Sequence, residues 1–183
     1  MRYQETHPGY EELIAGNLRL IQPDFEHTEP SLLWVKDNGV VQYMGVDFPT
    51  PTAEGERRRI EEILENQDEY SWMIEMDGEV IGNVCINSIE EQTKKYGQKA
   101  GSLTFLVGDK NFWGKGIATK ACKAVLDWAK RNGFQMMSAR ALQENIGSIK
   151  TLVKLGFIQT TTDPYDGLVA GESSVWHNFE RTL

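Results

Sequence analysis

A glycine-rich turn between a buried strand and a helix constrains this chain more than any other sequence feature. The apolar run LTFLVG, at positions 103–108, is followed by NFWGKGIAT at 111–119, after which apolar residues recur at helical spacing. A strand that passes through glycines into a helix presents backbone N–H groups together with the positive end of the helix dipole. Because glycine also lets a ligand approach the backbone closely, such a turn can bind phosphate oxygens. The pattern therefore favours an α/β fold with a phosphate-binding turn.

Two common nucleotide-binding motifs do not fit this turn. A P-loop requires G-x-x-x-x-G-K-[ST], but five residues separate Gly108 from Gly114, and Lys115 is followed by Gly116. A dinucleotide fingerprint requires G-x-G-x-x-G, but Thr119 stands at the third glycine position. Glycines also serve as simple turn formers, so the turn by itself leaves a purely structural role open.

The other periodic segments predict strands first and then a β-α-β-α-β-β order, which means a mixed sheet covered by helices. The clearest hairpin spans 70–89 and turns at Asp77-Gly78, a dipeptide typical of tight hairpins. A single helix is expected over 28–45, with Thr28 as its N-cap, and the polar run 90–98 is expected to be a loop. The remaining expectations are a strand at 18–22, a surface helix after the proline-rich loop 47–52, a strand at 136–142, a helix at 145–156, and two final strands around a turn at 163–167.

The amino-acid composition and charge narrow the class of protein. With 40% hydrophobic and 25% charged residues, we expect one globular domain over residues 1–183. No apolar run approaches the roughly 18 residues of a membrane span, and the N-terminal segment lacks the apolar core of a signal peptide, so we expect a cytoplasmic protein with no membrane partner. The formal net charge of −8 argues against nucleic-acid binding, which needs a basic surface, and better fits a cationic or amine-bearing partner.

The cysteines and histidines give no sign of a metal site. Cys85 and Cys122 are isolated from each other in sequence and are expected to be small core residues. His7, His27 and His177 lie too far apart for any of the spacings by which a helix or a knuckle collects a metal. We therefore expect no metal.

The residues downstream of the turn identify a resemblance. Asn145 follows a predicted strand, Ser148 lies one helical turn later, and Gly156-Phe157 stand where that helix stops. This segment resembles the N-x-x-[S/A]…G-F segment of the GNAT superfamily of acetyl-CoA-dependent N-acetyltransferases, and within it the ribosomal-protein alanine N-acetyltransferase group.

The glycine turn carries the second half of the resemblance. The family's pyrophosphate-binding loop, [Q/R]-x-x-G-x-[G/A], is matched by Trp113-x-x-Gly116-x-Ala118, with tryptophan at the first position. The resemblance covers nearly the whole chain from residue 18 onward, and its specific part runs from 103 to 157. Two linked motifs in the right order are far more specific than either one alone.

The resemblance implies the GNAT fold, which is a mixed, mostly antiparallel twisted α/β sheet with helices on both faces. A V-shaped splay is implied between the strands at 103–107 and 136–142, where the pantetheine arm of acetyl-CoA pairs like an added strand. The implied cofactor-binding residues are Leu106, Val107, Gly108, Trp113, Gly114, Lys115, Gly116, Ile117, Ala118, Thr119 and Asn145. An N–H near Leu106 or Val107 would polarise the thioester carbonyl.

The catalytic groups are less fully specified by the sequence. Ser148 is the candidate that protonates the departing thiolate, because Leu152 stands where the superfamily often has a tyrosine. No carboxylate lies in the strand before the glycine turn, so Glu75, Asp47 and Asp166 remain candidates for the general base. The residues proposed to line the acceptor side are Trp34, Tyr43, Met44, Trp72 and the loop 46–52.

The resemblance implies an acetyl-CoA-dependent N-acetyltransferase that acts on a primary amine, either a protein N-terminus or a small molecule. It also allows a homodimer. One alternative is an aminoglycoside antibiotic N-acetyltransferase, because VVQYMG at 40–45 and GDKNFWGKGIAT at 108–119 resemble stretches of those enzymes. The other is a non-catalytic CoA-binding module, supported only by the missing strand carboxylate. Turnover with an amine panel separates the three.

Overall fold

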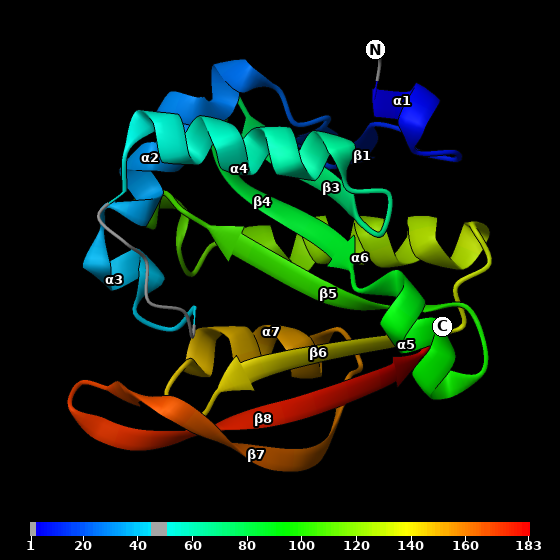
Figure 1. Cartoon of the computed structure of the whole chain (residues 1–183), viewed down its shortest axis with the longest axis vertical. Coiled ribbons are helices and arrows are strands. Elements are labelled where there is room, and N and C mark those ends of the chain that lie inside the picture. The colour runs from blue at the N-terminus through cyan, green and yellow to red at the C-terminus, as the bar shows by residue number, and fades with distance from the viewer. Residues whose placement is uncertain (1–2, 45–50) are drawn as a thin grey trace.

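A computed structural model describes residues 3–44 and 51–183, and the strands of this part of the chain form one eight-stranded sheet in the order β1-β2-β3-β4-β5-β6-β8-β7 (Figure 1). Neighbouring strands are antiparallel except for β5 and β6, which are parallel. The mixed, mostly antiparallel sheet expected from the sequence is confirmed. The strands are β1 (Leu13–Ala15), β2 (Leu18–Ile21), β3 (Tyr70–Met76), β4 (Glu79–Asn87), β5 (Ala100–Val107), β6 (Met136–Leu142), β7 (Ile158–Val169) and β8 (Glu172–Thr182).

Helices cover both faces of the sheet, as expected. Figure 1 shows α2 and α4 on the side facing the viewer and α6 behind the strands. The apolar face of α6 packs against β1, β4 and β5 and buries Val125 and Trp128 completely. On the opposite face, Trp34 of α2 and Val40 of α3 cluster with Met73 of β3. The helices are α1 (Tyr3–Thr6), α2 (Thr28–Val35), α3 (Asn38–Val41), α4 (Ala53–Glu65), α5 (Ile89–Tyr96), α6 (Ile117–Arg131) and α7 (Ile146–Lys154), with short 3-10 turns η1 (Phe25–His27) and η2 (Lys110–Phe112).

Strands β5 and β6 separate after a short paired region. They pair only at 100–102 with 136–138, ending at Ser102 and Ser138. Beyond that point β5 remains paired with β4 as far as Val107, while β6 remains paired with β8 as far as Leu142. Each strand therefore keeps one partner and loses the other, and the two diverge toward the left of Figure 1. The expected V-shaped splay is confirmed.

The polar run expected to be a loop is the helix α5. Its first turn holds Glu90 and Glu91 and its last turn holds Lys94 and Lys95, which is the charge arrangement that a helix dipole favours. Gly97, with φ of 67°, ends the helix in the left-handed conformation. The loop prediction was wrong because it relied on the lack of an apolar stripe and ignored these end signals.

Two other boundaries differ from expectation. The segment 28–45 contains two short helices, because Asp37 has extended backbone and accepts the Gly39 N–H at 2.8 Å to begin α3. Thr28 is the first residue of α2 and not its N-cap, since the cap role at this corner belongs to Asp24 of η1. Strand β1 was not expected.

The last hairpin turns at Ala170-Gly171 and not at 163–167. Both residues have positive φ, 52° and 87°, as do Asp77 and Gly78 in the β3–β4 hairpin that was correctly expected. The segment 163–167 lies within β7, where the pairing with β8 shifts register. Alanine is uncommon at positive φ, so Ala170 is not a residue that predicts a turn.

Both cysteines are buried, as expected, and burial raises the pKa of each thiol. Over residues 3–44 and 51–183, no group of three or more His, Cys, Asp or Glu side chains is arranged to hold a metal ion. None of the helices described in those ranges is long and apolar enough to cross a membrane.

Candidate active site

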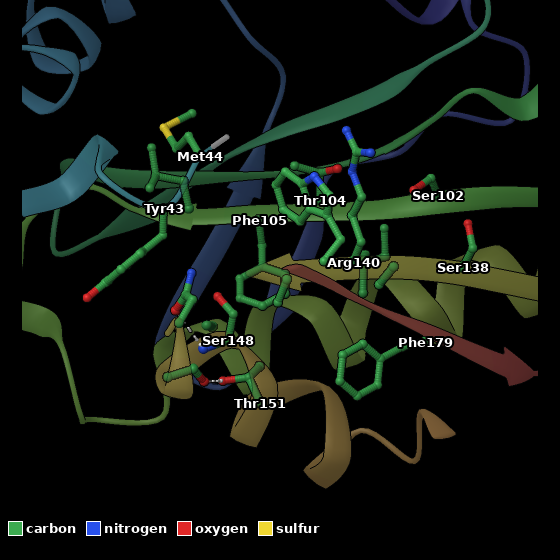
Figure 2. Close-up of a pocket in the computed structure, with 18 of the residues that line it drawn as sticks. Tyr43, Met44, Ser102, Thr104, Phe105, Ser138, Arg140, Ser148, Thr151 and Phe179 are labelled. Carbon is green, nitrogen blue, oxygen red and sulfur yellow. Dashed lines mark hydrogen bonds between the residues drawn. The ribbon is translucent and has the colours of Figure 1, made fainter. Parts of the chain in front are cut away.

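A cleft of about 1280 Å³ opens where β5 and β6 diverge. It is walled by α3, by the glycine turn before α6, and by the beginning of α7, with α5 at the other end of the sheet. Figure 2 shows Phe105 of β5 and Ser148 of α7 pointing toward each other across this space. The cleft therefore joins the two sequence motifs that are separated by about one strand and one helix.

The glycine turn presents bare backbone to the cleft. Gly114 and Gly116 have φ of 72° and 75°, and a β-carbon added at either would meet no heavy atom within 4 Å. Gly116 precedes α6 without any side-chain cap, and the first helical bond runs from the Lys120 N–H to the Gly116 carbonyl at 3.0 Å. The N–H groups that come before this bond, those of Ile117 and its two successors, have no helical acceptor. The turn thus combines close access with unpaired donors and the positive end of a 15-residue helix.

The hydrogen-bonding pattern of β5 decides which of its N–H groups faces the gap. The Gly108 N–H donates to the Ile81 carbonyl just beyond β5 at 2.9 Å. Along an antiparallel ladder, residue pairs that exchange backbone hydrogen bonds alternate with pairs that do not. The register of β4 and β5 is unbroken, so this alternation can be counted back from Gly108. The Leu106 N–H therefore faces β4, and the Val107 N–H faces the gap. The Val107 carbonyl points the same way and accepts the indole N–H of Trp113 at 2.7 Å. Of the two expected carbonyl-polarising donors, only Val107 has the required orientation.

Asn145 and Ser148 lie together at the start of α7. The Asn145 side-chain oxygen accepts the Ser148 backbone N–H at 3.1 Å and so caps the helix. This bond uses the amide oxygen of Asn145 and the backbone of Ser148, which leaves the amide NH₂ and the serine hydroxyl for other partners. Both residues line the cleft.

Two expected cofactor-binding residues do not line the cleft. Gly108 is buried, and a β-carbon added there would collide with the Trp34 indole, so this glycine is required for packing. Lys115 is exposed, and its Nζ lies 5.4 Å from the centre of the Phe112 ring. The residues from the expected set that do line the cleft are Leu106, Val107, Trp113, Gly114, Gly116, Ile117, Ala118, Thr119 and Asn145.

The side chains expected on the acceptor side separate into two groups. Tyr43 and Met44 line the cleft next to α3. Trp34 is buried against Val40, and Trp72 is fully buried in the core on the α6 side of the sheet, so neither lines it. Positions 46–50 of the expected loop lie outside the described residues.

The carboxylates expected as general bases do not line the cleft where they are described. Glu75 pairs with Arg19 at 2.8 Å, and Asp166 is an exposed residue of β7. Asp47 lies outside the described residues. Among the described residues, the carboxylates that line the cleft are Glu91, Glu144, Asp163 and Glu180, none of which the sequence analysis singled out.

Glu144 is the cleft carboxylate next to the two motif residues of α7. It accepts hydrogen bonds from the Ser174 hydroxyl at 2.6 Å and from the Gln143 amide at 2.9 Å. Burial acts to raise the pKa of its carboxyl, but these hydrogen bonds outweigh that effect and hold the pKa below its usual value. The group is therefore ionised at neutral pH. Its position just before the motif residue Asn145 was the signal that could have identified it.

An ion pair joins the segment before the glycine turn to the cleft wall that contains Tyr43 and Met44. Lys110 of η2 contacts Asp37 at 2.6 Å, and Asp37 in turn accepts the Gly39 N–H that begins α3. The hydrogen bond from Lys110 lowers the pKa of the Asp37 carboxyl. Helix α3 is followed by Tyr43 and Met44, so one short chain of contacts links the segment that precedes the glycine turn to the wall that contains those two side chains.

Comparison with known proteins places this geometry in a family. Residues 17–158 match the acetyltransferase (GNAT) domain. The probable N-acetyltransferase YjcK of Bacillus subtilis is 34% identical over 116 residues, which cover 58% of this chain and 59% of that protein. The chain spans less than two thirds of the length of the first curated relatives it matches, at 22%, 59% and 23%.

Solved structures share the whole fold at low identity. RimL, a ribosomal L7/L12 alpha-N-protein acetyltransferase in complex with coenzyme A, has a TM-score of 0.81 at 18% identity, over 94% of this chain and 98% of that one. The microcin C7 self-immunity acetyltransferase MccE, in complex with acetyl-CoA and AMP, has a TM-score of 0.74 at 18% identity, over 92% of this chain and 93% of that one. At this identity the likeness establishes the fold.

Proposed function

We propose that this chain, which belongs to the acetyltransferase (GNAT) family, transfers the acetyl group of acetyl-CoA directly to a primary amine. The observation that carries the proposal is that one cleft brings together the glycine turn, the gap between β5 and β6, and the start of α7. Each of these meets a different part of a CoA thioester. The coenzyme A bound to RimL and the acetyl-CoA bound to MccE support the choice of cosubstrate.

The glycine turn is assigned to the pyrophosphate of acetyl-CoA. The N–H groups of Ile117, Ala118 and Thr119 donate to its oxygens, and the α6 dipole adds positive potential at the same point. Gly114 and Gly116 leave room for the phosphates because a side chain at either position would occupy the space beside the backbone. In this assignment, unpaired backbone N–H donors bind the pyrophosphate anion, and the side chain of Lys115 is not required.

The gap between β5 and β6 is assigned to the pantetheine arm and the thioester. Backbone groups of β5 that face the gap can bond the arm as a neighbouring strand would, and the NH₂ group of Asn145 donates to it from the other side. The Val107 N–H is placed to stabilise the negative charge that develops on the thioester oxygen.

Transfer then proceeds by one addition and one elimination. The neutral amine attacks the thioester carbonyl, the C–S bond breaks, and the Ser148 hydroxyl donates its proton to the thiolate and regains one through water. The acceptor must first lose its ammonium proton, which can pass through water to the solvent, because the lowered pKa of the Glu144 carboxyl makes that group a weak proton acceptor. Overall, one amine proton ends on the CoA thiol.

An acyl-enzyme intermediate is disfavoured because both cysteine thiols are buried and protonated. Cys85 and Cys122 are both buried, and burial raises the pKa of each, so neither forms a thiolate at neutral pH. Direct transfer to the acceptor requires no enzyme nucleophile. The likeness to RimL favours the N-terminal amine of a protein as the acceptor class.

Acetyl-CoA is expected to protect the fold against heat. A ligand bound only by the native state adds about 2.7 kcal/mol at a hundredfold excess over its Kd, which corresponds to about 5–10 °C in Tm for a domain of this size. Thermal melts with acetyl-CoA, NADH and ATP at matched concentrations measure this effect. Equal or greater protection by NADH or ATP would count against the assignment of the glycine turn.

A further inference from the structure

We infer that Arg140 and Trp176 form an anchor for an acid group carried by the acceptor, so that the enzyme prefers amines with a nearby carboxylate or phosphate. The inference rests on the proposed function and narrows its substrate class. Arg140 lies in β6, two residues beyond Ser138, the last residue of β6 that pairs with β5. It therefore stands where the gap opens.

The side chains of β6 and β8 show which face of the sheet Arg140 occupies. Ala139 and Ala141 of β6 are buried in the core on the α6 side, as is Phe179 of β8. Alternation along each strand puts Arg140 and Trp176 on the opposite face. Figure 2 shows Arg140 and Phe179 extending to opposite sides of the sheet.

This opposite face is covered by α5 at the start of β5, where Gln92 bonds Ser138 and Tyr96 bonds Glu180, and it becomes exposed farther along at Thr104 and Arg140. Helix α2 contacts β4, and α4 packs on α2, so neither contacts the exposed part of this face. Ser148, by contrast, approaches the gap from α7. An amine that arrives from the exposed part of this face can reach a thioester held in the gap while the rest of the acceptor remains beside Arg140.

The Arg140 guanidinium is held in place without being neutralised. Its central carbon lies 4.4 Å from the centre of the Trp176 ring, which is a cation–π contact. Arg140 forms no ion pair with a carboxylate in residues 3–44 and 51–183. A planar guanidinium stacked on an indole keeps its N–H edge free, and that edge matches the two oxygens of a carboxylate or phosphate.

Three cleft carboxylates accept hydrogen bonds from other protein groups and form no ion pair with Arg140. Glu180 accepts the Tyr96 hydroxyl at 2.6 Å, Asp163 accepts the Asn178 amide at 2.6 Å, and Glu144 accepts the Ser174 hydroxyl at 2.6 Å. The net charge of −8 suggested a cationic partner, but Arg140 offers a positive group in the cleft that pairs with no carboxylate of the described residues. A group that supplies the missing anion is favoured there.

Acetylation kinetics with matched peptides test the anchor. Three peptides that differ only in Asp, Asn or Lys at the second position are compared at saturating acetyl-CoA, together with free aspartate. We expect kcat/KM for the Asp peptide to exceed that for the Asn peptide by about tenfold, which is the effect of one charge-assisted hydrogen-bonded pair. Free aspartate that turns over with the same dependence on Arg140 supports a small-molecule source of the acid group, and activity restricted to the peptide supports a protein source.

The variants separate an anchor from a general loss of function. Arg140→Gln should abolish the preference by raising KM for the Asp peptide, with its kcat and the acetyl-CoA KM unchanged, whereas Arg140→Lys should keep part of it. Trp176→Leu should weaken it because the guanidinium loses its support. Lys94→Gln removes an exposed cation outside the cleft lining and should leave the preference intact.

Three outcomes would overturn the anchor. Equal kcat/KM for the Asp and Asn peptides in the wild type is one, and an equal loss with all three peptides in Arg140→Gln is another. A preference for the Lys peptide that persists in Arg140→Gln would point to a polycationic acceptor such as an aminoglycoside. In each case the acetylation of some amine leaves the proposed function standing, while the absence of turnover with every amine defeats both.

Discussion

Replacement of Gly116 by valine is expected to raise the Kd of acetyl-CoA by about 30-fold, equivalent to about 2 kcal/mol. The glycine has φ of 75° and open space around the position of a β-carbon, beside the unpaired N–H groups that begin α6. A branched side chain would fill the space that the pyrophosphate needs. Titration calorimetry on folded protein measures the Kd directly.

Backbone strain must be separated from the loss of the site, because valine is unfavourable at positive φ by about 1–2 kcal/mol wherever it is placed. Gly133 supplies a matched control. It has φ of 83°, a β-carbon there would also meet no neighbour, and it lies just past the other end of α6. We expect Gly133→Val to lose comparable stability and no affinity. If Gly116→Val lowers the free energy of unfolding but leaves the Kd of acetyl-CoA unchanged, the turn is structural and its assignment to the pyrophosphate is wrong.

Replacement of Ser148 by alanine is expected to lower kcat by about tenfold, with little change in the Kd of acetyl-CoA. The helix cap uses the backbone N–H of Ser148, so removal of the hydroxyl leaves α7 capped. The loss is limited because water can partly replace a hydroxyl in an open cleft and because the Val107 N–H remains. Full kcat in Ser148→Ala would remove this residue from the mechanism and leave water as the acid.

Asn145 provides the paired test of cofactor binding. Asn145→Ala removes both the cap and the NH₂ donor, whereas Asn145→Ser keeps a cap acceptor and removes only the donor. If Asn145 holds the pantetheine arm, both variants should weaken acetyl-CoA binding, and only the alanine variant should also lose about 1 kcal/mol of stability. Unchanged affinity in Asn145→Ser would limit this residue to its structural role.

Local signals in the sequence were sufficient for most of the fold. The Asp77-Gly78 turn and the apolar spacing of α6 each specify their element without help from distant residues. The secondary-structure predictions were wrong where the local sequence signal for an element was weak or unusual. Helix α5 depends on charges at its ends, and the last hairpin turns at an alanine with positive φ. The splay of β5 and β6 followed from the family resemblance, since it depends on pairing between distant strands.

The site was less accessible to sequence reasoning because its groups come from several strands. The glycine turn and the α7 start were identified since each is a contiguous motif. The choice of Val107 over Leu106 needed the register of β4 and β5. Arg140 and Trp176 are separated by 36 positions and meet only because β6 pairs with β8. No local pattern marks such a pair.

The most direct measurement is acetyl transfer itself, followed by mass spectrometry of both the amines and the protein after incubation with acetyl-CoA. The amine panel contains acidic, neutral and basic peptides and an aminoglycoside. We expect at least one amine to gain a single acetyl group, with one CoA thiol released per product and no acetyl group left on the protein. Acetyl-CoA binding without acetylation of any amine above the enzyme-free rate would contradict direct transfer and identify a CoA-binding module instead.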